Sequence, residues 1–159
     1  MMTFDELAEM AADAQEKERQ YQYCVRVCTA AGCISQHSDS IKNALIDEVK
    51  AQGRDSEIRI KGVGCMGLCA AGPLVSVEPG GILYEQVTVE DVPALVKSIG
   101  KKPLASLRLD EHMPFFERQV KIVLENSGVI DPESIEDYLN AGGYEALNQI
   151  LAHMSPSEV

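Results

Sequence analysis

Four of the five cysteines lie in two closely spaced pairs, and this pattern constrains the chain more than any other feature of its sequence. Cys28 and Cys33 are separated by four residues, and Cys65 and Cys69 are separated by three. Each pair follows a stretch with the alternating apolar pattern of a β-strand. If the two strands are parallel neighbours, their carboxyl ends lie at the same edge of a sheet. We therefore expect the four thiols to converge in a metal site.

The elements predicted around these cysteines form an α/β unit. A helix over residues 3–19 begins with a capping box of Thr3 and Glu6. The other predicted elements are, in chain order, a strand over 21–27, a helix over 38–52, a strand around Ile58 and Ile60, a hairpin of strands 74–78 and 82–87, and a helix over 89–99. A strand-helix-strand unit pairs its strands in parallel, and a hairpin can extend the same sheet with antiparallel strands. This layout resembles the thioredoxin-like fold, although other topologies have the same content.

The spacing alone leaves the nature of the metal open. Thiolates select zinc or an iron-sulfur cluster over harder ions. Zinc sites with four cysteines usually have two residues between paired cysteines, and the gaps here are longer. Longer gaps favour a 2Fe-2S cluster in which each pair holds one iron, with Cys28, Cys33, Cys65 and Cys69 as ligands. A structural zinc module and unliganded thiols are the alternatives, whereas the lack of any Cys-x-x-Cys argues against a thioredoxin-type dithiol.

Two other residues near the pairs are not expected to be ligands. Cys24 precedes Cys28 by four residues, which is roughly 13 Å along an extended strand, and it is predicted to pack within that strand. His37 could replace a cysteine, as histidines do in Rieske centres. Four cysteines suffice, however, and a surface histidine at a helix start is the more common case.

The motif around the second pair adds a resemblance to a known family. The first pair is followed by Cys65-Met-Gly-Leu-Cys69 and then by Ala71-Gly72-Pro73. This succession resembles the thioredoxin-like 2Fe-2S ferredoxins, the family of a peripheral iron-sulfur subunit of respiratory complex I, and the resemblance covers about residues 21–100. It implies that the four paired cysteines hold a 2Fe-2S cluster and that the chain transfers electrons.

The last third of the chain carries a second resemblance. Its motifs are Pro114-Phe115-Phe116-Glu117-Arg118-Gln119, Leu124-Glu125-Asn126-Ser127-Gly128, the segment from Ile130 to Tyr138, and Gly142-Gly143-Tyr144-Glu145-Ala146-Leu147. They resemble the beginning of the NADH-binding flavoprotein subunit. With a ferredoxin domain in front, the succession is most similar to the diaphorase subunit of bidirectional NAD-linked nickel-iron hydrogenases. Related fusions occur in NAD-dependent formate dehydrogenases, iron-only hydrogenase complexes and complex I-like flavoproteins.

This second resemblance implies that FMN, NAD and a 4Fe-4S cluster bind in a later part of the parent subunit. We expect the chain to be cut short of those sites, because Ser155-Pro156-Ser157-Glu158 has the order of a helix start and Val159 is the last residue. The expected partners are the rest of the flavoprotein, other diaphorase or hydrogenase subunits, and a ferredoxin. On its own the chain is expected to have no catalytic residue and neither to bind flavin nor to oxidise NADH.

The residue pattern of the last third predicts a string of short helices. An apolar face from Phe116 to Leu124 predicts a helix that ends before Gly128. Asp131-Pro132 predicts the start of the next helix, and residues 144–151 predict a third. The alternative to a flavoprotein segment is a small helical cap on the ferredoxin domain.

Charge and breaker residues divide the chain into three predicted parts. Residues 1–20 are expected to form an N-terminal helix. The two resemblances imply that residues 21–103 form a thioredoxin-like 2Fe-2S ferredoxin domain and that residues 104–159 are the helical start of a truncated flavoprotein domain. The boundary lies at Gly100-Lys101-Lys102-Pro103, which ends one apolar pattern. The last part carries 3 basic and 10 acidic residues.

Overall charge and hydropathy exclude two classes of partner. The net charge of −11 would repel the phosphate backbone of a nucleic acid. No apolar stretch approaches the roughly 20 residues that cross a bilayer, so no membrane-spanning segment is expected. The first residues are acidic and lack the pattern of a secretory signal, so we expect a cytoplasmic location.

Overall fold

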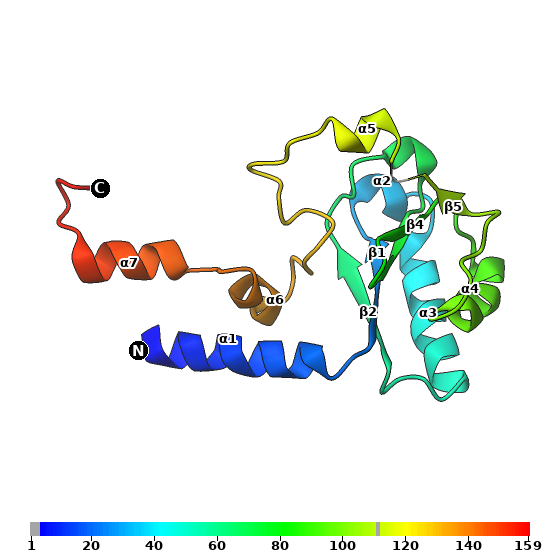
Figure 1. Cartoon of the computed structure of the whole chain (residues 1–159), viewed down its shortest axis with the longest axis horizontal. Coiled ribbons are helices and arrows are strands. Elements are labelled where there is room, and N and C mark those ends of the chain that lie inside the picture. Colours follow the sequence, from blue (N-terminus) through cyan, green and yellow to red (C-terminus); the bar gives the residue numbers. More distant parts are fainter. Residues whose placement is uncertain (1–3, 111) are drawn as a thin grey trace. The chain divides into compact units, whose positions relative to one another are not determined.

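The computed structural model describes residues 4–110 and 112–159, which form two compact units (Figure 1). The larger unit is Gln20–Asp131 and contains all five cysteines. The smaller unit combines α1 (Phe4–Arg19) with Pro132–Val159. Both paired-cysteine motifs therefore belong to one unit.

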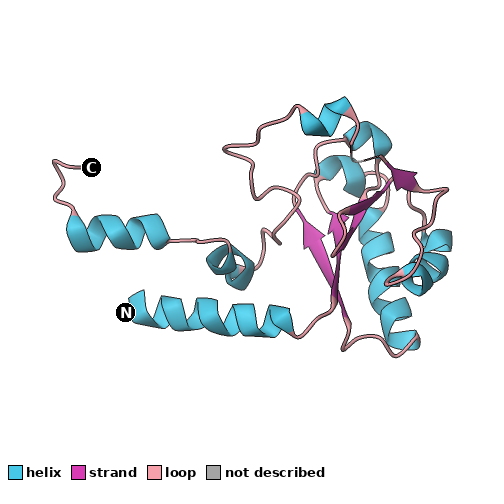
Figure 2. Ribbon diagram, viewed as in Figure 1, coloured by secondary structure: helices cyan, strands magenta, loops and turns pink. Residues whose placement is uncertain are grey.

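The larger unit is built on a five-stranded sheet with the order β2-β1-β3-β4-β5 (Figure 2). Its strands are β1 (Tyr23–Cys28), β2 (Ile58–Val63), β3 (Val75–Glu78), β4 (Ile82–Tyr84) and β5 (Arg108–Leu109). The β1–β2 pair is parallel, and the other three neighbouring pairs are antiparallel. The predicted strand-helix-strand unit and hairpin are thus confirmed in a single sheet. β5 has no predicted counterpart, because two residues are too few to show an alternating pattern.

Helices and short 3-10 turns complete the larger unit. They are α2 (Ala31–Ile34), α3 (Ser38–Ala51), η1 (Cys69–Ala71), η2 (Val89–Asp91), α4 (Val92–Ser98) and α5 (Pro114–Glu117). α3 connects β1 to β2, and it packs beside α4 and against the sheet (Figure 2). The predicted helices over 38–52 and 89–99 are therefore confirmed in position, the latter as η2 followed by α4.

The main hydrophobic core lies between the sheet and these two helices. Alternation along β1 turns Val25 and Val27 into this core. Helical spacing along α3 brings Ile41, Leu45 and Val49 to the opposite side of it. The core also includes Ile58, Val75, Val77, Tyr84, Val87, Val92, Leu95, Val96 and Ile99. This packing fixes the two strands that precede the cysteine pairs.

The last strand of the hairpin is shorter than its sequence predicts. β4 ends at Tyr84, although the apolar alternation continues to Val87. Gln86 has a φ of 50°, in the left-handed region, so the chain turns away from the extended conformation there. The Gln86 N–H donates to the carbonyl of Ala71 at 2.9 Å, outside the sheet ladder.

The smaller unit is helical. It contains α1, α6 (Ile135–Asn140) and α7 (Glu145–His153), and α1 packs against α6. The predicted helix start at Asp131-Pro132 is wrong, because the Ser134 hydroxyl accepts a hydrogen bond from the Asp137 N–H at 3.1 Å and caps α6. The predicted capping residue Thr3 lies outside the described residues.

The predicted helix from Phe116 to Leu124 is also wrong. Only α5 forms, and the chain from 119 to 134 is irregular. Val120, Ile122 and Val123 are β-branched, which lowers helix propensity. Their side chains are 77–94% exposed, so no packing of an apolar face stabilises a helix there.

No helix among the described residues is long and apolar enough to cross a membrane. The longest, α1, has 16 residues and contains several acidic side chains among its apolar ones.

Leu45→Ala is expected to lower the free energy of unfolding of the larger unit by about 2–5 kcal/mol, because it leaves a cavity in a well-packed core. Leu45 is fully buried on α3, between helix and sheet. Val89→Ala is the control, since Val89 is 44% exposed. Urea unfolding followed by circular dichroism measures both, and equal losses for the two variants would contradict the position of this core.

Candidate metal centre

Parallel pairing of β1 with β2 brings two loops to one edge of the sheet. Cys28, the last residue of β1, lies opposite Val63, the last residue of β2. Thr29 continues the pairing past the strand ends, because its N–H and its hydroxyl both donate to the Val63 carbonyl, at 2.9 and 3.0 Å. The loops that carry the cysteine pairs therefore start side by side, as the sequence predicts.

The first cysteine pair lies inside the protein. Cys28 and Cys33 are each 1% exposed, and the single turn of α2 brings the Cys33 thiol into contact with Cys28. The pKa of Cys33 is raised to about 11, mainly by burial. The neighbouring Cys28 also raises it, whereas the hydrogen bond that the Cys33 sulfur accepts from the Leu74 N–H lowers it. Without a cation nearby, the Cys33 thiol therefore keeps its proton.

The second cysteine pair lies at the surface. The sulfurs of Cys65 and Cys69 are 3.8 Å apart, and Cys69 is exposed. The Gly67 N–H donates to the Cys65 sulfur at 3.4 Å, from a backbone φ of 101° that favours glycine. Contact with Cys65 raises the pKa of Cys69. The neighbouring Cys65 thus opposes ionisation of the Cys69 thiol.

Two glycines let the loops approach each other closely. A Cβ atom on Gly32, in the first loop, would lie 3.3 Å from the sulfur of Cys69 in the second. A Cβ atom on Gly72, in the second loop, would lie 3.0 Å from the sulfur of Cys33 in the first. Both contacts join one loop to the other, so the two loops that carry the predicted ligands lie against each other.

The comparison with protein families decides what kind of domain this is. Residues 13–100, more than half of the chain, match the family of thioredoxin-like 2Fe-2S ferredoxins. The chain belongs to this family. It therefore carries a 2Fe-2S ferredoxin-like electron-transfer domain, with the α/β fold that the sequence predicts.

Individual relatives agree with the family. The chain is 36% identical over 66 residues to a 2Fe-2S ferredoxin of Clostridium pasteurianum, covering 42% of this chain and 65% of that protein. It is 49% identical over 43 residues to the NADP-reducing hydrogenase subunit HndC of Solidesulfovibrio fructosivorans, covering 27% of this chain and 9% of that protein. The chain thus spans less than two thirds of either relative.

A solved structure shows the same fold. The thioredoxin-like 2Fe-2S ferredoxin of Aquifex aeolicus superposes with a TM-score of 0.53 and 27% sequence identity. The superposition covers 57% of this chain and 98% of the Aquifex chain. The superposition therefore includes almost the whole length of the Aquifex ferredoxin.

The residues at this edge fit a 2Fe-2S cluster. A binuclear cluster needs two pairs of thiolates, and contacts between thiols are made within each pair here. Among the described residues, no three Cys, His, Asp or Glu side chains surround one point as the ligands of a single ion do. Gly32 and Gly72 leave room against the sulfurs where any larger residue would intrude.

Cys24 and His37, which the sequence predicts not to be ligands, lie in β1 and at the start of α3. Cys24 lies within β1, opposite Arg59 of β2 and Glu78 of β3 in the sheet register. His37 is exposed and precedes α3 as its N-cap residue, with a φ of 66°.

One contact at the second loop has no signal in the sequence. The Ser127 hydroxyl donates to the Cys65 carbonyl at 2.8 Å across a separation of 62 residues. No motif spacing or periodicity marks such a long-range contact. In the sequence, Ser127 is notable only as part of a motif that resembles a flavoprotein subunit.

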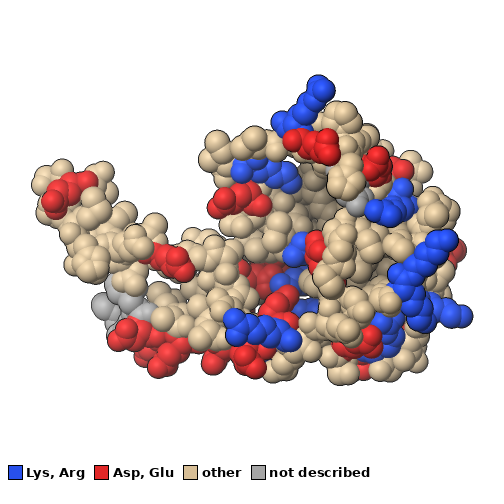
Figure 3. Space-filling view, in the orientation of Figure 1, with Lys and Arg blue, Asp and Glu red and all other residues tan. Residues whose placement is uncertain are grey.

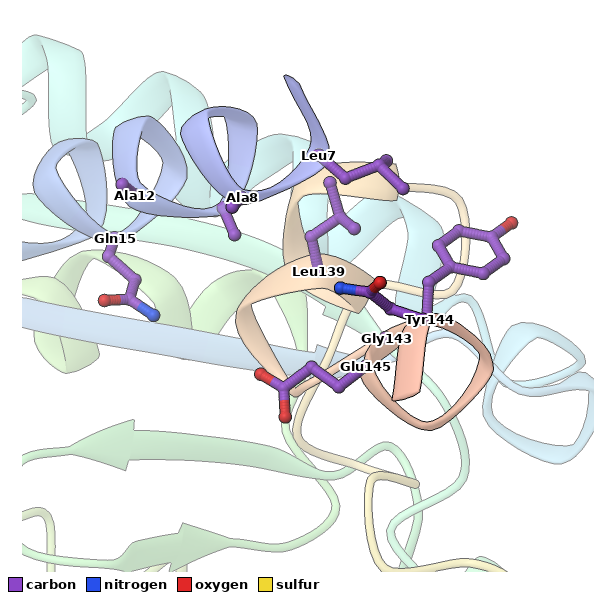
Figure 4. Close-up of a pocket in the computed structure, with 10 residues that line it drawn as sticks. Leu7, Ala8, Ala12, Gln15, Leu139, Gly143, Tyr144 and Glu145 are labelled. Carbon is purple, nitrogen blue, oxygen red and sulfur yellow. The ribbon is translucent and has the colours of Figure 1, made fainter. Parts of the chain in front are cut away.

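Both units have cavities near the surface. In the larger unit, a cavity of about 670 Å³ is lined by Gly72 and Pro73 of the second loop, by His37 and Ser40 at the start of α3, and by Thr88. In the smaller unit, Figure 4 shows a pocket of about 270 Å³ between α1 and the α6–α7 segment, where Leu7 and Leu139 project toward each other. The second pocket contains none of the predicted ligands.

Replacing any of the four paired cysteines with alanine should remove most of the bound iron, because a thiolate ligand is lost. Cys24→Ala is the matched control and should retain the iron of the wild type, since Cys24 lies in the sheet. Iron per chain and visible absorption of anaerobically purified protein measure this. Loss of iron from the Cys24 variant, or full iron in the Cys65 and Cys69 variants, would contradict the ligand set.

The metal-free protein should become less stable as pH rises from 9.0 to about 11. In that range the Cys33 thiol ionises in the unfolded chain but keeps its proton in the folded one, so unfolding is favoured. This part of the pH dependence should vanish in Cys33→Ser, whose hydroxyl does not titrate there. Urea unfolding at several pH values under reducing conditions tests it, and an unchanged slope in the variant would refute it.

Proposed function

We propose that this chain is the electron-transfer part of an NADH-oxidising diaphorase (flavoprotein) subunit in an NAD-reducing hydrogenase complex. The observation that carries this proposal is the 49% identity over 43 residues to a hydrogenase subunit, in a chain that belongs to the 2Fe-2S ferredoxins. The motifs of residues 114–147 support it, because they resemble the beginning of a flavoprotein subunit.

The four paired cysteines are the proposed ligands, with different tasks for the two pairs. A bound 2Fe-2S cluster supplies transfer of one electron at a time. Cys28 and Cys33 hold its inner side away from water, since both are buried. Cys65 and Cys69 hold its outer side, and the exposed Cys69 allows a partner to approach closely.

Backbone groups around the thiols adjust how easily an electron is accepted. Hydrogen bonds to the sulfurs stabilise the more negative reduced state and raise the reduction potential. The Gly67 N–H donates to Cys65, and the Leu74 N–H donates to Cys33. Each pair therefore receives an amide hydrogen bond from this chain.

The proposed partners follow from this role. The remainder of the flavoprotein subunit would hold FMN, NAD and a 4Fe-4S cluster, and other hydrogenase subunits or a ferredoxin would exchange electrons with it. Acidic side chains gather along α1 on the face that Figure 3 shows. The first turn of α1 contains Asp5 and Glu6. Such a surface favours a basic docking partner. We place this exchange in the cytoplasm, where thiols stay reduced.

The proposal predicts how the oxidised protein responds to NADH. NADH alone should leave its visible absorption unchanged, because this chain is proposed to lack the flavin and nucleotide sites. Addition of the isolated NADH-binding flavoprotein subunit of an NAD-linked hydrogenase should bleach the absorption, and electron paramagnetic resonance should then show a spin-half signal.

An unrelated NADH-flavin reductase at equal activity is the control. Reduction at the same rate with this control enzyme would remove the support for a specific diaphorase role, while leaving the ferredoxin domain itself in place. Direct reduction by NADH would contradict the assignment of the nucleotide site to another part of the subunit.

A further inference from the structure

A segment beyond the family-matched residues closes over the second cysteine loop. The family match ends at residue 100, and Ser127 and Gly128 lie well past it in the same compact unit. Figure 1 shows the chain after α5 returning past the carboxyl end of β2. We call Ser127-Gly128 the clasp.

The clasp contacts the backbone on both sides of a proposed ligand. The Ser127 hydroxyl donates to the Cys65 carbonyl at 2.8 Å. A Cβ atom on Gly64 would lie 3.3 Å from that hydroxyl oxygen, and a Cβ atom on Gly128 would lie 3.1 Å from the Cα of Met66. The three residues from Gly64 to Met66 are thus touched in succession.

Glycine is required on the clasp side of this contact. Gly128 has a φ of 83°, which side chains rarely adopt, and its nearest neighbours are the backbone and side chain of Met66. Met66 is 9% exposed and packs in a small apolar cluster with Cys28 and Cys33. The clasp therefore packs on Met66, which joins the loop of Cys65 to the buried pair of Cys28 and Cys33.

We propose that Ser127 and Gly128 are positioning residues for the 2Fe-2S cluster: they fix the loop that carries Cys65 and thereby limit access to the outer side of the site. This inference rests on the proposed ligand set. The segment between the ferredoxin domain and the helical tail would then support the cluster site, and would not merely connect the two parts. Its basis is the three contacts above, which converge on one ligand-bearing turn.

The first test compares two serine variants of the full chain. In Ser127→Ala, bathophenanthroline disulfonate under anaerobic reducing conditions should remove iron about fivefold faster, the factor that one hydrogen bond of ordinary strength supplies. The reduced protein should also show altered g-values in electron paramagnetic resonance. Ser127→Thr keeps the hydroxyl and should restore both properties.

Ser98→Ala is the matched control. The Ser98 hydroxyl also donates to a carbonyl, that of Leu95 at 2.7 Å, in the same unit but on α4. This variant should release iron and give g-values as the wild type does. Urea unfolding of both alanine variants shows whether the difference at Ser127 exceeds any general loss of stability.

A pair of glycine variants tests the clasp independently of the hydroxyl. Gly128→Ala should speed iron release, because its Cβ meets Met66. Gly53→Ala has the same kind of backbone strain, at a φ of 66°, but open space around the new atom. It should release iron at the wild-type rate.

The outcomes separate this inference from the proposed function. If the wild type carries the cluster and Ser127→Ala matches Ser98→Ala in iron release and g-values, the positioning role is refuted and the electron-transfer role stands. Equal effects of Gly128→Ala and Gly53→Ala would refute it as well. If the wild type binds no cluster, the ligand set fails and this inference falls with it.

Discussion

Parallel pairing between β1 and β2 is the interaction on which the rest of the ferredoxin domain depends. The two cysteine pairs are far apart in the sequence, and only this pairing brings their loops to one edge of the sheet. The α3 crossover makes the pairing possible, and its apolar face packs on the strands that it joins. Packing of this core therefore holds the two cysteine loops next to each other.

The two cysteine pairs differ in how deeply they are buried. Cys28 and Cys33 are part of a small apolar cluster, whereas Cys69 is exposed to solvent. Burial keeps water from one side and strengthens electrostatic interactions there. Exposure on the other side shortens the distance to any protein that docks. An electron carrier benefits from both, since it must hold its cofactor and still reach its partners.

The sequence predicts the part of this site that rests on periodicity and spacing. Alternation along β1 and helical spacing along α3 are strong because both elements bury one face, so the parallel unit and the convergence of the loops follow from them. The prediction of a helix from Phe116 to Leu124 is wrong because this segment buries no face. Its apolar residues meet the helical period, but they have no core to pack against in the described structure.

Contacts between distant irregular segments are beyond such prediction. The Ser127 to Cys65 hydrogen bond joins two loops whose conformations are set by glycines with left-handed or closely packed backbones. The same holds for Gln86, whose positive φ ends β4 early although its neighbours keep the alternating pattern. In each case the deciding factor is the position of another backbone, which no local pattern records.

The unequal depth of the two cysteine pairs also bears on how the domain matures. Of the four paired cysteines, Cys69 would be the most accessible to a protein that delivers a cluster, whereas Cys28 and Cys33 are buried. Gly67 gives the loop that carries Cys69 a turn of unusual backbone geometry with open space around it. The exposed pair would thus be the natural point of contact for a protein that helps the domain mature, and the buried pair would be shielded from it.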